Sequence, residues 1–388
     1  MKKHIVFVLF AATILYGCPS SNRPAPQVAD VVVSVIPSEI DKTFYLSQLY
    51  ANYEIIPLGS TDDVLVGNPN RIVSFGDRYY VGDGLTYNQR EQRLHVFSKT
   101  GEYLHSIGQR GRGPGEYISL YDFSISPDPV LYLLDRDTDR VLRYRLDGAF
   151  IDEFEVNIKA TNIEVDDNRI YLYANGWHPF GEREEAWQLR ILDREGNEQA
   201  RLLHLDDVRA YPAGSSVIIY PSRAFSPTED GILFSMPLHE TVYLLEGENA
   251  TPWRTLDFGR NRIPDSFFAQ NGDSRDFSEL LRETQYAKNI HNVFKVGDVL
   301  FFNFHMNNRR YQIAAKDDEA YNVKDDILGL MPDLHTFIMN KNEYIGVFSQ
   351  THISFMLNGS YSDFKEKLTA SGITVDEDSN PLLVRYWN

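Results

Sequence analysis

Four of the ten histidines follow apolar segments typical of β-strands, and each lies three to five residues beyond the expected strand end. Because these strands occupy equivalent places in a repeated unit, we expect the imidazoles to gather on one side of the fold. They are His178, with Trp177 beside it, and His239, His305 and His352. Imidazole can bind a metal, bind an anion when protonated, or act as a general base. The spacing predicts a ligand-binding group; ordinary polar residues in surface loops are the alternative.

A glycine-rich segment, Gly108-QRGRGPGEY, places two arginines where they could hold a carboxylate or sulfate. Arg110 and Arg112 would present planar guanidinium groups that match such oxyanions. The segment lacks both the helix of a dinucleotide-binding fingerprint and the Lys-Ser/Thr pair of a P-loop. Its glycines and Pro114 also favour a second interpretation, a tight crossover in which Glu116 and the arginines join neighbouring sheets. In either case we expect this loop on the same side as the four histidines.

No other motif in the sequence indicates catalysis. The chain has no Gly-x-Ser-x-Gly elbow and no His-Glu-x-x-His pair, and its single cysteine, Cys18, excludes an internal disulfide or a multi-cysteine metal site. Adjacent acids occur in turn-like contexts, where we expect them to be solvated, with a bound calcium ion as the alternative. These pairs are Asp62-Asp63, Asp166-Asp167, Asp206-Asp207, Asp317-Asp318 and Asp325-Asp326. We predict no catalytic residue and no cofactor, with calcium as the candidate ion.

The first thirty residues predict export and lipid attachment. Lys2 and Lys3 precede an apolar run, Ile5 to Tyr16, which is too short to span a bilayer and is typical of a secretory signal. The run ends in Leu15-Tyr16-Gly17-Cys18, which resembles the lipobox of bacterial lipoproteins, where the cysteine is acylated and becomes the mature N-terminus. We assign residues 1–17 to a signal peptide and residues 18–30, rich in Pro, Ser and Ala, to a lipidated tether.

The charge of the chain restricts its partners. It has 38 Lys and Arg against 55 Asp and Glu, a formal charge of −17, which becomes −19 when Lys2 and Lys3 leave with the signal. An acidic body lacks the basic excess that nucleic-acid binding needs and is repelled by anionic lipid headgroups. We expect membrane attachment through the lipid alone, no nucleic-acid partner and a monomeric body. Since no acidic run follows Cys18, an outer-membrane lipoprotein on the periplasmic face is slightly favoured over one on the cell surface.

The rest of the sequence repeats one unit, a short strand and a Gly or Asp/Asn turn followed by further apolar strands. Six units predict an all-β six-bladed β-propeller over residues 31–388, because stacked blades bury both apolar faces of every sheet. The predicted blades span roughly 70–120, 121–159, 160–222, 223–290, 291–333 and 334–388. The last unit lacks one strand, which a strand near 53–58 would supply. Apolar residues at helical spacing predict two inserts, Ser266–Asn289 and Tyr361–Ser371.

Four segments resemble the six-bladed β-propeller lipoproteins of Bacteroides-like bacteria, which are related to NHL-repeat propellers. They are Ile107-GQRGRGPGEY, Ile55-IPLGSTDDVLVG, Val96-FSKTGEYLHSIG and Asp378-SNPLLVRYW. Together with the lipobox, the resemblance covers nearly the whole mature chain. It implies the propeller architecture, and the family has no established enzymatic activity that it could imply.

We therefore expect a non-enzymatic binding or scaffold protein that presents a ligand face to a glycan, a peptide or an envelope partner. Tyr87, Trp177, Phe180 and Phe304, near the histidine loops, would suit stacking on sugar rings. The alternative is a propeller hydrolase or lyase that acts on a lactone or a uronic-acid glycan through the His and Arg residues. The missing catalytic motifs favour the binding protein.

Overall fold

The computed structural model describes most of the chain after the predicted tether. The described residues are 29, 31–59, 64–85, 91–176, 182–205, 207, 223–271, 276–327, 333–340, 343–349, 353–354, 362–375 and 379–388. Cys18, Trp177, His178 and His352 lie outside them. Within these ranges, no helix has the length and apolar character needed to cross a membrane.

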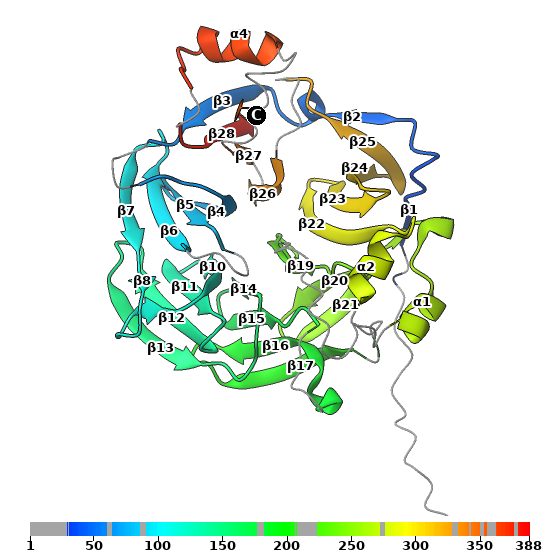
Figure 1. The fold of residues 1–388 in the computed structure, drawn as a ribbon, viewed down its shortest axis with the longest axis horizontal. Helices are drawn as coiled ribbons and strands as arrows, with labels where there is room; N and C mark the ends of the chain where they lie inside the picture. Colours follow the sequence, from blue (N-terminus) through cyan, green and yellow to red (C-terminus); the bar gives the residue numbers. More distant parts are fainter. Residues whose placement is uncertain are drawn as a thin grey trace, which may run out of the picture.

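Six β-sheets surround a common axis, and the chain is the all-β six-bladed propeller that the sequence predicts (Figure 1). The first three sheets contain β4 (Pro69–Phe75), β5 (Arg78–Asp83), β6 (Arg93–Ser98) and β7 (Tyr103–Ile107); β10 (Leu120–Ile125), β11 (Val130–Asp135), β12 (Arg140–Arg145) and β13 (Phe150–Glu155); and β14 (Asn162–Val165), β15 (Arg169–Tyr173), β16 (Trp187–Asp193) and β17 (Glu198–His204). The next three contain β18 (Phe225–Pro227), β19 (Ile232–Phe234), β20 (Thr241–Glu246) and β21 (Asn249–Asp257); β22 (Lys288–Val296), β23 (Val299–Met306), β24 (Arg309–Lys316) and β25 (Glu319–Lys324); and β26 (Asp333–Asn340), β27 (Glu343–Phe348) and β28 (Leu382–Trp387).

The segment before the first sheet adds one strand to each of the last three sheets. β1 (Val32–Ser34) pairs in parallel with β21, and β2 (Thr43–Tyr45) pairs in parallel with β25. β3 (Asn52–Pro57) takes the fourth place in the sixth sheet, antiparallel to β28, where the sequence analysis places a closing strand. The sequence does not predict β1 and β2, because a three-residue edge strand is too short to show an alternating pattern.

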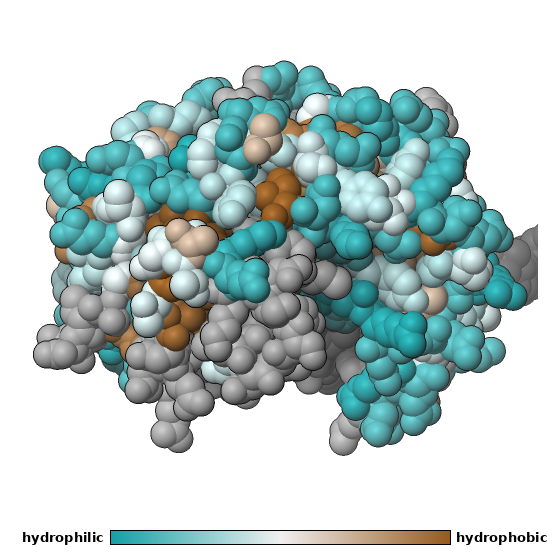
Figure 2. Space-filling view, turned by 90° about the horizontal axis from the view of Figure 1, so that it is seen from above, coloured by the Kyte–Doolittle hydropathy of each residue, from teal (hydrophilic) through white to brown (hydrophobic). Residues whose placement is uncertain are grey.

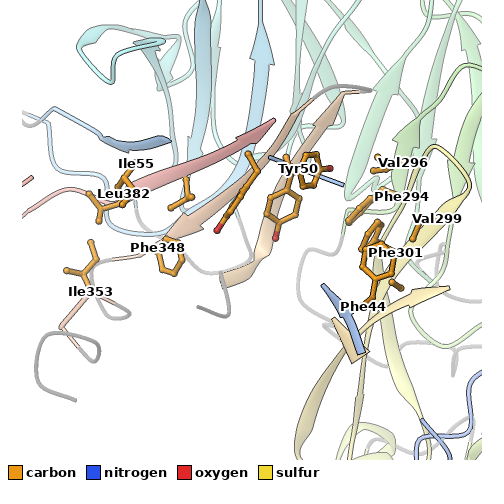
Figure 3. Close-up of a cluster of buried hydrophobic side chains, with 14 of the residues drawn as sticks. Phe44, Tyr50, Ile55, Phe294, Val296, Val299, Phe301, Phe348, Ile353 and Leu382 are labelled. Carbon is orange, nitrogen blue, oxygen red and sulfur yellow. The ribbon is translucent and has the colours of Figure 1, made fainter. Parts of the chain in front are cut away.

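Among the described residues, a buried hydrophobic cluster lies at each of the six junctions between neighbouring sheets. At the junction of the fifth and sixth sheets, Phe294 stacks on Phe301 with ring centroids 5.0 Å apart. Phe348 and Leu382 lie on the opposite side of the same cluster, and Tyr50 lies between the two groups (Figure 3). Each sheet is therefore covered on both faces, which accounts for most of the Tyr and Phe in the chain.

A helical insert connects the fourth and fifth sheets. It contains α1 (Asp265–Asn271) and α2 (Phe277–Arg282). Phe277 packs in a buried cluster with Leu205 and Leu238, which lie in connections of the third and fourth sheets. This cluster holds the insert against the ring.

The insert is shorter than the sequence predicts. The predicted helical span Ser266–Asn289 is wrong at its end, because from Lys288 onward the chain pairs with β23 as a strand. The β-ladder of the fifth sheet thus overrides the helical spacing of the apolar residues. α4 (Ser362–Ala370) lies within the second predicted helix, Tyr361–Ser371.

Figure 2 shows the ring from its edge, and the coloured part of that surface is mostly hydrophilic, with hydrophobic residues in a few small areas. The large hydrophobic side chains exposed in the described part of the chain lie mainly on outer strands and their neighbours. They are Val32, Tyr45, Tyr53, Leu65, Leu104, Phe150 and Ile151. Charge and hydrogen bonding are therefore better guides to a binding site here than exposed apolar area.

An ionic cluster joins the innermost strands of the first three sheets (Figure 1). Arg71 on β4 lies with its Nε 3.2 Å from Asp122 on β10 and its Nη2 3.5 Å from Glu164 on β14. All three side chains are buried, and Ser124 also donates a hydrogen bond to Glu164. Burial raises the pKa of Asp122, and the nearby charge of Arg71 opposes that shift. Arg71 thus compensates two buried carboxylates from two other sheets.

Replacing Arg71 should destabilise the fold strongly. The change Arg71→Met removes the ion-pair partner of Asp122 and Glu164, while the charge of the buried Arg223 still acts on both carboxylates. Breaking a buried ion pair typically costs about 3–5 kcal/mol, and the remaining charge of Arg223 should keep the loss at about the lower end of that range. Urea unfolding measures the loss. The control is Arg145→Met, which removes an exposed ion pair with Asp147 and should change stability by about 0.5 kcal/mol or less. Equal effects of the two changes would contradict the role assigned to Arg71.

A second ionic cluster joins the first and sixth sheets, where the ring closes. Glu343 on β27 is buried and accepts hydrogen bonds from Ser74 of the first sheet (2.8 Å) and Arg385 (2.5 Å). Lys99, from the first sheet, lies 3.6 Å from the same carboxylate. Burial by itself would raise the pKa of Glu343, but the two hydrogen bonds and the charges of Lys99 and Arg385 outweigh it and lower the pKa.

This lowered pKa predicts an acid-sensitive closure. Glu343 contributes stability above its ordinary pKa of 4.5, and that contribution is lost as the pH falls through the lower folded value. Glu343→Gln should therefore lower the melting temperature at pH 7, and its deficit relative to the parent protein should shrink as the pH falls below the ordinary pKa of 4.5. Thermal melts across this range provide the measurement. Glu102→Gln, an exposed change, is the control, and a deficit independent of pH would refute the assignment.

Candidate functional site

A basic cavity of about 340 Å³ lies where the fifth sheet meets the helical insert. It is lined by Arg282, Lys288, Asn289, His305, Asn308, Arg309 and Arg310. Four of these seven residues are Arg or Lys and none is Asp or Glu, although Asp and Glu outnumber Lys and Arg by 55 to 38 in the chain. The side chains that line the cavity therefore carry a positive charge, although the protein as a whole is strongly acidic. We call it the basic pocket.

A tight hairpin positions two of the arginines. Asn307 and Asn308 join β23 to β24, and both have positive φ, +52° and +57°. Two successive residues with positive φ match the hairpin turn that follows the twist of antiparallel strands, and Asn tolerates that conformation better than most residues. Arg309 and Arg310 follow at once as the first residues of β24, so the turn brings both to the pocket.

An irregular start to β22 positions the histidine. The register of β22 against β23 shifts between Lys288 and His291, and Asn289 has φ +55°. Such bulges redirect side chains. The Asn289 amide donates to Nδ1 of His305 (3.3 Å), and the Asn289 carbonyl accepts from Nδ1 of His291 (2.5 Å). Since Nδ1 of His305 accepts a hydrogen bond, its proton in the neutral form is assigned to Nε2.

Lys288 fixes the helical wall of the pocket. Its buried Nζ donates to the carbonyl oxygens of Leu281 (2.5 Å), Arg282 (3.3 Å) and Thr284 (3.4 Å), at the C-terminus of α2. A cation is favourable there because the last carbonyls of a helix are unpaired and carry partial negative charge. Burial, and then the charge of Arg282, lower the pKa of Lys288. Lys288 therefore holds Arg282, the last residue of α2, at the pocket.

Two cations of the pocket have no ion-pair partner among the described residues. In the part of the chain that the structure describes, neither Arg282 nor Arg309 forms an ion pair with a carboxylate. By contrast, Arg140, Arg143 and Arg190 each lie within 2.6 Å of an acidic side chain. Arg282 and Arg309 are thus available to an external anion.

The predicted arginine loop lies elsewhere, at the outer rim of the ring (Figure 1). Arg110 ends the short strand β8 (Gln109–Arg110), which pairs in parallel with β9 (Glu116–Tyr117). Arg112 lines a cavity of about 410 Å³ beside β13, with Phe150 and Ile151 among its neighbours. Arg112 and His305 therefore line two different cavities.

The contacts of this loop support the crossover interpretation. The Glu116 carboxylate accepts hydrogen bonds from the Gly113 amide (2.7 Å) and the Gln109 side chain (2.6 Å), which lower its pKa. A Cβ at Gly111 would lie 2.0 Å from that carboxylate, so the position requires glycine while Glu116 keeps its place. Arg140 of the second sheet donates to the Glu116 carbonyl (3.2 Å), which ties the loop to the next blade.

His239 lies in a turn near the basic pocket rather than among its lining residues. Its Nδ1 accepts a hydrogen bond from the Thr241 amide (3.1 Å), and its ring packs on Tyr243. A hydrogen bond from the Ile290 amide to the Pro237 carbonyl (2.9 Å) joins this turn to β22. Of the predicted histidines that the structure describes, only His305 lines the pocket.

Two further sequence predictions can be compared with the structure. Phe304 does not suit sugar stacking, because its ring is fully buried and stacks on Tyr311 at 4.8 Å. Asp317 and Asp318 form the hairpin between β24 and β25 with φ +51° and +63°, in agreement with the turn interpretation. The expectation that the acid pairs are solvated is wrong for Asp325, which is buried and accepts a hydrogen bond from the Tyr386 hydroxyl (2.7 Å). Among the described residues, no group of three or more His, Cys, Asp or Glu side chains is arranged to hold a metal ion.

Sequence reasoning missed most of the basic pocket. The prediction names His305, but not Arg282, Lys288, Arg309 or Arg310. One local signal was present, the Arg-Arg pair directly after an Asn-Asn turn in an acidic chain. Arg282 and Lys288 carry no such signal, since only the packing of α2 on the ring brings them to the hairpin.

The fold and its basic pocket define a six-bladed propeller with a cationic site beside a helical insert. Residues 31–386 match a family described as a domain of unknown function, DUF4934, and the chain belongs to that family. No curated protein matches the sequence.

Two solved structures share the architecture. A candidate exported protein from Bacteroides fragilis NCTC 9343 is similar over 92% of this chain and 99% of its own, with a TM-score of 0.73 and 17% identity. A member of the DUF4221 family from Bacteroides vulgatus ATCC 8482 is similar over 87% of this chain and 96% of its own, with a TM-score of 0.50 and 9% identity. At these identities the likeness concerns the fold alone.

The crossover predicts a coupled pair of substitutions. Gly111→Ala displaces the Glu116 carboxylate and Glu116→Ala removes it, so each should lower the urea midpoint of unfolding through the same lost hydrogen bonds. The double variant should then be clearly less destabilised than the sum of the two. Gly67→Ala is the control, because an added Cβ there meets nothing within 4 Å. Urea unfolding of all four variants tests this, and strict additivity would contradict the shared contact.

Proposed function

We propose that this protein is a lipid-anchored binding or scaffold protein of the cell envelope, which holds a glycan, a peptide or an envelope partner on one face of the ring. The support for anchoring is the signal-like N-terminus with its lipobox cysteine, Cys18. The lack of an acidic run after Cys18 supports the periplasmic face of the outer membrane over the cell surface, and the acidic charge supports attachment through the lipid alone. The similar structure from Bacteroides fragilis is described as an exported protein, which is compatible with export of this chain.

The observation that carries the proposal is an asymmetry between the two faces. Within each antiparallel sheet, the turns after the first and third strands share one face, and they are short, as at residues 76–77, 99–102 and 146–149. The connections after the second and fourth strands share the other face, and they include residues 174–186, 205–224, 258–287 and 349–381. Long connections on a rigid scaffold are where binding residues concentrate. We call this second face the long-connection face.

The basic pocket belongs to the long-connection face. Arg282 belongs to the connection into the fifth sheet, and Lys288 is the first residue of β22, where that connection ends. Arg309 follows the hairpin after the second strand of the same sheet. The hydrolase or lyase alternative depends on joint action of the loop arginines and the histidines. Because Arg112 and His305 line different cavities, the geometry favours binding over that alternative.

Photocrosslinking in intact cells tests the choice of face. A photoreactive residue at Glu283, next to α2 on the long-connection face, should capture a defined envelope partner or glycan. The same residue at Asp298, in the short turn between β22 and β23, is the matched control and should capture none of it. Products at both positions alike, or at Asp298 only, would overturn the proposed face.

A further inference from the structure

The basic pocket contains two kinds of group that a sugar acid would need. Arg282 and Arg309 supply guanidinium forks, which pair with planar carboxylates through two parallel hydrogen bonds. His305 and Asn308 supply an imidazole and an amide, whose hydrogen-bonding groups suit hydroxyls. A bare ion would need only the first kind of group. The volume, about 340 Å³, falls at the lower end of pockets that hold small ligands.

The pocket is also held in shape before any ligand arrives. Lys288 is hydrogen-bonded to the end of α2, Asn289 is hydrogen-bonded to His305, and the Asn307-Asn308 turn sets the start of β24. Both residues of that turn and Asn289 adopt a left-handed backbone conformation that costs energy in most residues and recurs at binding sites. Preorganisation reduces the entropy lost when a ligand binds.

We propose that the basic pocket binds the carboxylate-bearing sugar units of an acidic glycan, with Arg282 and Arg309 on the carboxylate and His305 and Asn308 on neighbouring hydroxyls. Lys288 and Asn289 are positioning residues. Lys288 is hydrogen-bonded to the end of α2, and the Asn289 side chain is hydrogen-bonded to His305. This inference rests on the proposed function, because it names the ligand class of the long-connection face.

Repulsion from the rest of the molecule limits which acidic glycans can bind. The formal charge of −17 disfavours any polyanion away from the pocket, so affinity depends on a few close contacts with the arginines. Added salt should weaken these contacts, because charges at a partly open site are screened. Uncharged glycans lose the arginine contacts altogether.

The test compares a tetragalacturonate with its fully methyl-esterified, uncharged counterpart by calorimetry on the full chain purified in detergent. We expect the acid to bind at least tenfold more tightly than the ester. Arg282→Gln and Arg309→Gln should each weaken acid binding about tenfold and leave ester binding unchanged. Arg145→Gln changes an exposed arginine at the end of β12, beside a short turn on the face opposite the long-connection face; it is the matched control and should change nothing. Equal melting temperatures show that the variants remain folded.

Several results would overturn the inference. Equal binding of acid and ester, or acid binding that survives both arginine changes, would show that the carboxylate is not recognised in this pocket. If inorganic sulfate or phosphate binds as tightly as the tetragalacturonate, the pocket does not recognise the sugar hydroxyls, and that part of the proposal fails. If no acidic probe binds while Glu283 still captures a partner, the ligand class is wrong and the binding face stands. If Glu283 captures nothing, the proposed function itself fails.

Discussion

The pairing of β3 with β28 is the interaction on which the rest of the structure depends. Each sheet is apolar on both faces, so it is stable only with a neighbour on either side. Five junctions form between sheets that follow one another along the chain, but the sixth needs the first and last sheets to meet. β3 makes that possible, because it belongs to the sixth sheet and leads directly into the first. The ionic cluster around Glu343 then joins the same two sheets.

A closed ring allows irregular features that a marginal sheet would not tolerate. The fifth sheet carries β2 on its outer edge and hydrophobic clusters on both faces, so β22 can begin with a bulge and two asparagines at positive φ. The helical insert, held by its own apolar cluster, can then end beside that bulge. The basic pocket forms where these two irregular elements meet. The fifth sheet and the helical insert hold the cationic side chains together, and hydrophobic clusters stabilise both elements.

Strand patterns that depend on near neighbours could be predicted from the sequence. The six repeated units, the closing role of a segment near 53–58 and the second helical insert all follow from alternation or from helical spacing. The same reasoning fails where long-range pairing competes with local spacing. Lys288 follows a helical pattern but pairs with β23, and Asn289 lies in the irregularity that follows it. β1 and β2 become strands only because β21 and β25 offer open edges.

The sequence by itself determined the fold class, because the repeated strands carry apolar residues that must be buried on both faces of each sheet. It also indicated which residue types could bind an anion, and it included His305 among them. Only the tertiary structure decided which of those residues act together. Arg112 and His305 belong to connections on the same face, yet the crossover turns outward along β13 while the hairpin at Asn308 meets α2. How far a loop lies from the propeller axis, and whether Arg282 and Arg309 line the same pocket, depend on how whole elements pack. No local pattern in the chain encodes that packing.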